Sequence, residues 1–183
     1  MQLRRLLTRR FCSKASSFIH IHQPQIWPSE LLESVRKDVQ LSCNFINPEE
    51  EALLVEEAEK ALKKLRYEED HTDNAIYLYR ETEKRRWGAT CEAILDRVRE
   101  FSFPQDSRHL SYIHILDLHK DGHIKPHIDN ERYCGDIVSG LSLLSPAVMR
   151  LVHKDKPELR VDLLLEQRSL YKLAGVGRWE ERK

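Results

Sequence analysis

Residues 159–171, LRVDLLLEQRSLY, decide the fold class of this chain. From Leu159 to Leu165 every second side chain is apolar, and this period of two is typical of a strand with one buried face. Residues 166–168 (EQR) then predict a turn, and residues 169–171 begin another strand. The stretch therefore predicts two short strands joined by a turn.

Strand patterns also recur upstream of this stretch. Residues 110–118 alternate in places, residues 120–122 (KDG) predict a turn, and residues 123–129 predict a short strand broken by Pro126. Two further strand-like runs follow at residues 140–145 and 148–153. Short strands at such regular spacing indicate a β-sandwich or barrel.

The first hundred residues carry helical signals instead. Residues 29–40 predict a short helix. Asn47 before Pro48, with Glu50 in the capping-box position, predicts the start of a longer helix whose apolar side chains recur at helical spacing. Residues 89–100 predict a third helix. Because helices come first and strands later, the sequence predicts an α+β architecture.

The composition is that of a single globular domain. The chain has 183 residues, of which 40% are hydrophobic and 33% are charged, as is ordinary for a folded domain. No apolar run approaches the length of about 18 residues that a membrane-spanning helix needs. The four cysteines are scattered without a Cys-x-x-Cys pair, which argues against a zinc knuckle and against a disulfide framework.

The amino terminus differs in charge from the rest of the chain. The first acidic residue is Glu30, and the basic residues before it are Arg4, Arg5, Arg9, Arg10 and Lys14. An Arg-rich, acid-free segment with interspersed leucines and serines predicts a mitochondrial transit peptide over residues 1–17, with a disordered basic tail as the alternative.

The remaining body lacks the charge of a nucleic-acid-binding protein. Without those five basic residues, a chain of zero net charge is left near −5. Nucleic-acid-binding proteins usually carry a broad basic surface. Residues 84–87 (KRRW) are the only candidate basic patch, and their pattern is more typical of a solvated turn.

Four His-x-Asp triplets are candidates for metal binding, at residues 71–73, 119–121, 127–129 and 153–155. In a strand, side chains two residues apart point the same way and can hold one ion. The first triplet lies in a polar stretch typical of a loop, and the second and fourth lie in predicted turns with lysine in the middle. His127 and Asp129 flank an isoleucine after a predicted strand and are favoured, with a solvated strand end as the alternative.

The flanking segments add a family resemblance. HILDLHKDGHIKPHID (114–129), GLSLLSPAVMRLVH (140–153) and RSLY (168–171) follow one another at spacings that resemble the AlkB-like 2-oxoglutarate- and Fe(II)-dependent dioxygenases. The resemblance extends from the first predicted helix to Tyr171. It implies that His127 and Asp129 are iron ligands and that Tyr171 hydrogen-bonds the co-substrate 2-oxoglutarate.

The resemblance also implies a fold, in which amino-terminal helices pack on a double-stranded β-helix, a jelly-roll-like core. On this basis residues 18–105 are expected to form a helical support region. Residues 106–183 are expected to form a partial core with an atypical tail over residues 172–183.

The function implied by the resemblance is that of a dioxygenase in the mitochondrial matrix. It would hydroxylate a protein side chain or demethylate RNA, with links to fatty-acid metabolism and programmed necrosis. The acidic body and the compact region where nucleic-acid demethylases carry a base-gripping lid favour a protein or other non-duplex substrate, with no DNA duplex expected. Two alternatives remain, namely a non-catalytic interaction protein that retains a partial barrel and a cupin-like sandwich without iron.

Two departures from the family pattern accompany the resemblance. Where many members have Asn-x-Tyr in contact with 2-oxoglutarate, this sequence is expected to have Asp117-x-His119. Beyond Tyr171 the family has a distal histidine and an arginine, whereas the tail here has no histidine and its Arg178 and Arg182 lie in a glycine-interrupted charged segment. The expectation is a carboxy-terminally shortened form with two of the three iron ligands.

Overall fold

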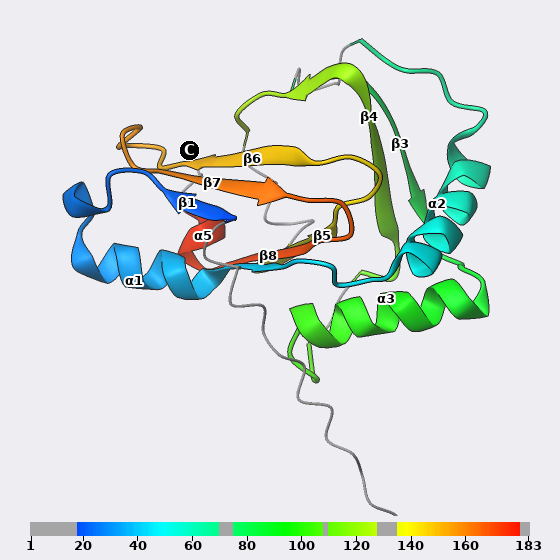
Figure 1. Cartoon of the computed structure of the whole chain (residues 1–183), viewed down its shortest axis with the longest axis horizontal. Coiled ribbons are helices and arrows are strands. Elements are labelled where there is room, and N and C mark those ends of the chain that lie inside the picture. The colour runs from blue at the N-terminus through cyan, green and yellow to red at the C-terminus, as the bar shows by residue number, and fades with distance from the viewer. Residues whose placement is uncertain (1–17, 70–74, 108–109, 128–134, 180–183) are drawn as a thin grey trace, which may run out of the picture.

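The computed structural model describes residues 18–69, 75–107, 110–127 and 135–179. Its elements follow the chain as β1 (Ile19–Ile21), the 3-10 helix η2 (Pro24–Ile26), α1 (Ser29–Asp38), β2 (Val39–Ser42), α2 (Pro48–Leu62), β3 (Ile76–Lys84), α3 (Ala89–Ser102), β4 (Ile113–Ile124), β5 (Ile137–Leu141), β6 (Ala147–Val152), β7 (Arg160–Leu165), β8 (Leu170–Ala174) and α5 (Val176–Trp179) (Figure 1). The predicted α+β architecture is confirmed.

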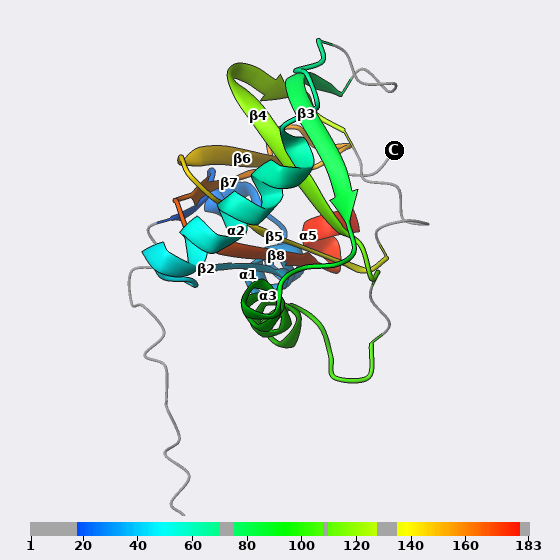
Figure 2. The ribbon, with the colours of Figure 1, turned by 90° about the vertical axis from the view of Figure 1, so that its right-hand side faces the viewer.

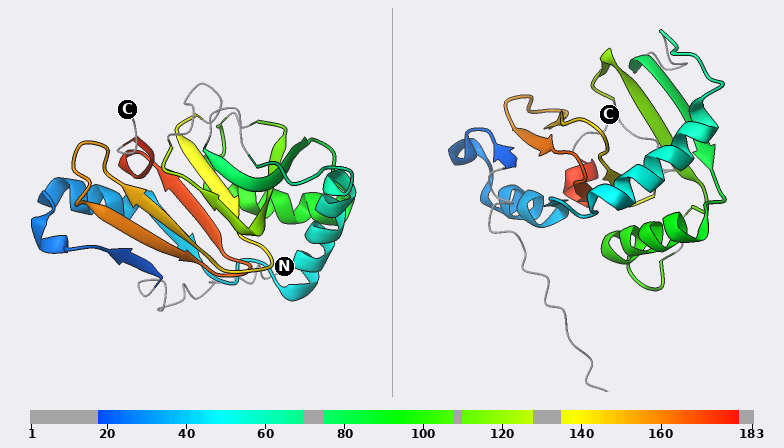
Figure 3. Two further views of the ribbon diagram at one scale, coloured as in Figure 1. Left: turned by 90° about the horizontal axis from the view of Figure 1, so that it is seen from above. Right: turned by 45° about the vertical axis from the view of Figure 1, so that its right-hand side comes forward.

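The strands form two three-stranded sheets and a two-stranded ribbon, all antiparallel. The β7 sheet has the order β1-β7-β6, the β8 sheet has the order β2-β8-β5, and the ribbon pairs β3 with β4. The two sheets lie one above the other (Figures 1 and 3). Buried side chains from both of them form a single apolar cluster, to which the β7 sheet contributes Leu151, Val161, Leu163 and Leu165 and the β8 sheet contributes Val39, Leu41 and Leu173.

A second apolar cluster covers the other face of the β8 sheet. Leu170 of β8 is completely buried there, together with Leu54 of α2 and Ile94 and Leu95 of α3. Figure 2 shows α2 running beside the ribbon and α3 beneath the β8 sheet. Because side chains alternate along a strand, Leu170 packs on the helices while its neighbour Tyr171 points between the two sheets.

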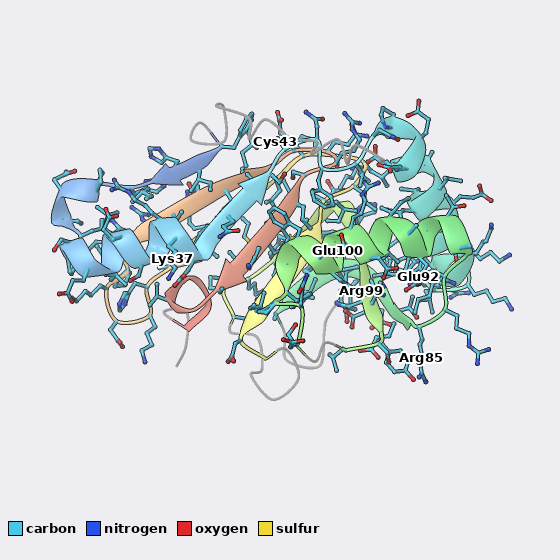
Figure 4. The ribbon with its side chains drawn as sticks, turned by 90° about the horizontal axis from the view of Figure 1, so that it is seen from below. Lys37, Cys43, Arg85, Glu92, Arg99 and Glu100 are labelled. Carbon is cyan, nitrogen blue, oxygen red and sulfur yellow. The ribbon has the colours of Figure 1, made fainter. Side chains whose placement is uncertain are left out.

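The helices lie where the sequence predicts them, and α2 begins at the predicted capping box. Asn47 caps α2 by accepting a hydrogen bond from the backbone N–H of Glu50 at 2.8 Å, and the Glu50 carboxylate accepts from the Asn47 N–H at 3.0 Å. This is the predicted capping box, with Pro48 at the first helical position. On α3, Arg99 donates to Glu92 and Asp96 at 2.6 Å each, so this helix carries paired charges on its solvent side (Figure 4).

Three strands lie in the region expected to be helical support. β1 pairs with β7, β2 pairs with β8 and β3 pairs with β4, so each is held by a segment far along the chain. The expected tail also begins inside a strand, because Lys172 to Ala174 belong to β8. After it, α5 packs against α1, and the backbone N–H of Val176 donates to Asp38 at 3.2 Å.

The predicted turn at residues 120–122 is wrong, because β4 continues through it as one strand. The irregularity lies across the ribbon instead, where β3 has a bulge and Leu78 adopts a left-handed φ of 53°. A Cβ at Gly122 would lie 2.5 Å from the carbonyl oxygen of Leu78. Gly122 is therefore required for close approach to the bulge. Of the strand predicted at residues 123–129, only the first two residues belong to β4.

A buried carboxylate joins α2 to both sheets. Glu51 is only 5% exposed. Its carboxylate accepts hydrogen bonds from the backbone N–H of Leu144 at 2.8 Å, from Nε2 of Gln167 at 2.9 Å and from Nη1 of Arg168 at 3.3 Å. Leu144 lies between β5 and β6, and Gln167 and Arg168 lie in the turn between β7 and β8. One side chain therefore fixes two turns against a helix.

Replacing Glu51 by alanine is expected to lower the free energy of unfolding by roughly 2–4 kcal/mol, because three donors around a buried site lose their acceptor. Chemical denaturation measures this loss. Glu56→Ala is the matched control, since Glu56 is exposed and its ion pair is with the exposed Lys60, and it should cost no more than about 0.5 kcal/mol. Equal effects of the two substitutions would contradict the role given to Glu51.

A second charged cluster lies on the outward face of the β7 sheet. Arg150 donates to both oxygens of Asp162 at 2.7 and 2.8 Å, and Nε2 of His22 donates to Asp162 at 2.9 Å. The hydrogen bonds from Arg150, with that from His22, hold the pKa of Asp162 well below its ordinary value, although partial burial opposes the shift. The ionised carboxylate is therefore favoured in the folded protein.

Because the pKa of Asp162 is lower in the folded state than in the unfolded state, its ionised side chain adds to the free energy of unfolding. This stabilisation is fully present above the unfolded-state pKa of about 4 and is lost as the pH falls below that value. We expect Asp162→Asn to lower the free energy of unfolding by roughly 2 kcal/mol at pH 7. The difference from the parent chain should shrink below about pH 4, as measured by denaturation across pH. Asp155→Asn, at an exposed position, should show neither effect, and a difference for Asp162→Asn that does not vary with pH would refute this account.

Candidate functional site

Tyr171 lies in the middle of β8, directly opposite Gly140 of β5. Its half-buried side chain packs against the apolar cluster between the two sheets. Two serines link β8 to α3 at this position. Ser139 of β5 donates to the carbonyl oxygen of Tyr171 at 2.8 Å, and Ser102 of α3 donates to Ser139 at 2.6 Å. The sequence alone gave no sign of this link between the two serines.

Gly140 makes the position of the Tyr171 ring possible. A Cβ at residue 140 would lie 2.4 Å from Cε1, Cζ and the hydroxyl oxygen of Tyr171. Real Cβ atoms do not approach other atoms so closely, so the ring crosses β5 only because residue 140 has no side chain. The phenol is thereby held over the inner face of the β8 sheet.

His127 lies just after β4 and is exposed. Its Nδ1 is 3.0 Å from the carbonyl oxygen of Lys125. A carbonyl can only accept, so Nδ1 carries the proton and Nε2 carries the lone pair of the neutral ring. Histidines that bind metals usually donate their second ring N–H to a backbone carbonyl or a carboxylate. The donor set at His127 therefore fits a metal ligand that binds through Nε2.

Asp129, the second predicted ligand, lies outside the described residues, as does the triplet at residues 71–73. Within the described ranges no group of three His, Cys, Asp or Glu side chains could hold a metal ion. The two other histidines of the triplets have local roles. Nδ1 of His119 accepts from the backbone N–H of Asp121 at 3.2 Å, and Nδ1 of His153 accepts from that of Asp155 at 3.1 Å.

Asp117 and His119 contact Tyr67, which follows α2, and Arg80 links Asp117 to α2 itself. The Asp117 carboxylate accepts from the Tyr67 hydroxyl at 2.8 Å and from Nε of Arg80 at 2.7 Å, while Arg80 also donates to Glu59 of α2 at 2.8 Å. The His119 ring meets the edge of Tyr67 with centroids 5.1 Å apart. The Asp117 carboxylate is thus held by Arg80 and Tyr67, at the position where the sequence departs from the Asn-x-Tyr pattern of many family members.

The basic segment at residues 84–87 is largely neutralised or stacked. Lys84 lies 3.5 Å from the Glu57 carboxylate and 5.3 Å from the Trp87 ring centroid. The guanidinium of Arg85 lies 5.8 Å from the centroid of Tyr112. Two of the three cations in this segment, Lys84 and Arg85, therefore lie against aromatic rings, and Lys84 also lies near a carboxylate.

Nucleophilic chemistry does not fit the buried thiol of Cys91. Burial raises the pKa of the Cys91 thiol to about 11, and its hydrogen bond to Glu57 contributes to the shift. The thiolate is the nucleophilic form of cysteine, so Cys91 is inert at neutral pH. It serves as a small apolar residue in the cluster between α2 and α3.

Known proteins resemble this chain over most of its length. The Mus musculus protein named alpha-ketoglutarate-dependent dioxygenase alkB homolog 7, mitochondrial, is 46% identical over 152 residues, which are 83% of this chain and 69% of that protein. The Bos taurus protein of the same name is 48% identical over 136 residues, which are 74% of this chain and 62% of that protein. No family model matches.

The chain therefore belongs to the AlkB-like family of dioxygenases that depend on α-ketoglutarate, the same compound as 2-oxoglutarate. Both relatives are alkB homolog 7 proteins and are named as mitochondrial. The predicted family is thus confirmed.

No described helix has both the length and the apolar character needed to cross a membrane.

The contact between Gly140 and Tyr171 can be tested by a double-mutant cycle. Gly140→Ala is expected to cost roughly 1–3 kcal/mol of stability, because the added methyl group must displace the ring. In a Tyr171→Leu background the same change should cost at least about 1 kcal/mol less. Unfolding by urea of the four proteins gives the coupling free energy. Additive costs would show that the ring does not lie over Gly140.

Proposed function

We propose that this chain is a 2-oxoglutarate- and Fe(II)-dependent dioxygenase of the mitochondrial matrix. The observation that carries the proposal is 46% identity over 152 residues to a protein whose name states the co-substrate and the organelle. The chain spans 69% and 62% of its two relatives, so activity is proposed from the shared part of the sequence.

In this proposal His127 and Asp129 hold the iron. The carbonyl of Lys125 keeps the proton on Nδ1 of His127 and so orients Nε2 as the ligand atom. A His-x-Asp pair is two-thirds of the ligand set that non-haem Fe(II) oxygenases use. When bound, the iron would supply the oxidative chemistry, in which one oxygen atom of O2 enters succinate as 2-oxoglutarate loses CO2 and the other hydroxylates the substrate.

Tyr171 is proposed to bind the co-substrate. Its phenolic hydroxyl can donate a hydrogen bond to a carboxylate of 2-oxoglutarate. Gly140 holds the ring over the inner face of the β8 sheet, and the Ser102–Ser139 link holds the strand beneath it. A ring positioned in advance loses little conformational entropy when the co-substrate binds.

For the substrate we propose a protein side chain in preference to RNA, and not a DNA duplex. A body near −5 repels a phosphate backbone, and within residues 84–87 Lys84 is already paired with Glu57 and Arg85 lies over the Tyr112 ring. The proposed activity would connect the protein to fatty-acid metabolism and programmed necrosis, as the family resemblance implies.

Succinate formed from 2-oxoglutarate by the full chain, with Fe(II) and ascorbate, tests the assignment. His127→Ala should lower turnover at least 100-fold. Tyr171→Phe should raise the KM for 2-oxoglutarate by about tenfold, the effect of one hydrogen bond of about 1.4 kcal/mol. His153→Ala is the matched control and should change neither value, because its ring serves a local turn.

Other outcomes would select other functions. If calorimetry detects no Fe(II) binding while a protein partner is retained, the chain is a non-catalytic interaction protein. If His127→Ala changes neither iron binding nor turnover, a cupin-like role without iron is favoured. Turnover coupled to methylated RNA but to no peptide would overturn the proposed protein substrate.

A further inference from the structure

A groove of about 500 Å³ opens at the junction of α2, α3 and the turn between β7 and β8. It lies within the usual size range of small-molecule sites. Its lining consists of Asn44, Phe45, Ile46, Asn47, Pro48, Glu50, Arg97 and Arg168. Neither Tyr171 nor His127 contributes to it, so the groove is separate from the proposed dioxygenase site.

Two guanidinium groups enter this groove with more donors than their neighbours can accept. The backbone of Arg168 makes two hydrogen bonds of 2.8 Å, but the contacts given for its guanidinium within the described residues are long, at 3.3 Å to Glu51 and 3.5 Å to Asn44. Arg97 pairs with Glu50 through both terminal nitrogens, and its buried Nε–H has no acceptor in the described ranges. Each guanidinium has five N–H donors. The Nε–H of Arg97 is buried, so the donors that remain for a ligand are those on the terminal nitrogens of the two arginines.

The two carboxylates nearby, Glu50 and Glu51, already accept at least three hydrogen bonds each. Glu50 already accepts from Arg97 and from the backbone of Asn47, where it completes the cap of α2. Glu51 already accepts three hydrogen bonds from two turns, one of them from Arg168 itself. The cap also occupies the first turn of α2, so the groove depends on its two arginines and not on the helix end.

The backbone supports a role for the side chain at position 168. Arg168 adopts a left-handed φ of 66°, a conformation that glycine takes without strain and arginine does not. Unfavourable backbone conformations often occur where a side chain serves a function. Beside this arginine, Phe45, Ile46 and Pro48 give the groove an apolar wall.

We infer that this groove binds a carboxylate carried on an apolar group, either a small organic acid or the carboxy-terminal residue of a peptide. The carboxylate would lie between Arg168 and Arg97, where planar guanidinium groups can bind both of its oxygens. The apolar part would lie against Phe45 and Pro48.

Titration of the full chain with N-acetylphenylalanine, followed by amide NMR shifts, tests this inference. The shifts should concentrate at residues 44–47 and at Arg168, and the acid should bind at least tenfold more tightly than N-acetylphenylalaninamide, which lacks the carboxylate. Arg168→Gln and Arg97→Gln should each weaken binding of the acid at least tenfold. Arg36→Gln, which removes an exposed arginine on α1, should leave it unchanged.

An acetylated tetrapeptide ending in phenylalanine separates the two sources of the ligand. Tighter binding of the tetrapeptide than of N-acetylphenylalanine assigns the groove to chain termini, and equal binding assigns it to small acids. The wild-type comparison needs no variant, so it remains decisive even if Arg168→Gln unfolds the chain. Equal binding of acid and amide, shifts elsewhere, no binding, or weakening by Tyr171→Phe would each overturn the inference.

Discussion

The buried carboxylate of Glu51 is the interaction on which the arrangement of the two sheets depends. Helix α2 can lie against the strands only if the turns beneath it stay in place, and both turns donate to this one side chain. Loss of these hydrogen bonds would lower the free energy of unfolding strongly, because a buried donor without an acceptor costs more than a solvated one. Leu144 and Arg168 both have left-handed backbones, so the same carboxylate stabilises two turns that are unfavourable alone.

Strand β8 then connects this scaffold to the candidate site. Its side chains alternate between two environments, with Leu170 under the helices and Tyr171 between the sheets. The helices therefore affect the site through the strand, because Leu170 fixes the register that orients Tyr171. The same register sets Gly140 opposite the ring. The position of the phenol thus follows from packing on the far face of its own sheet.

The sequence predicts what short-range chemistry determines. The cap formed by Asn47 and Glu50, the alternation over residues 159–165 and the turn at residues 166–168 depend on neighbouring residues, and each is present. Strands β1 and β2 have three and four residues and are held only by partners more than 120 positions away, so no local pattern indicates them. Gly122 was misinterpreted because glycine serves turns and close backbone contacts equally well.

For the candidate site, the sequence likewise identified residues but not the contacts that position them. The triplet containing His127 could be selected by its apolar middle residue and by family resemblance, but the proton on Nδ1 depends on the Lys125 carbonyl, which only the folded backbone brings near. Tyr171 could be assigned by resemblance, whereas its support by Gly140 and the serine pair required the strand register. For Asp117, the hydrogen bonds to Tyr67 and Arg80 come from residues distant in sequence.

Because the first strands pair with the last ones, the two sheets can form only late in translation. β1 and β2 leave the ribosome early, yet their pairing strands, β7 and β8, are made only near residues 160–174. Neither sheet can close during most of synthesis, and contacts over such separations form slowly. Until then the apolar residues Val39 and Leu41 are left uncovered. The nascent chain therefore exposes apolar surface until β7 and β8 have been translated.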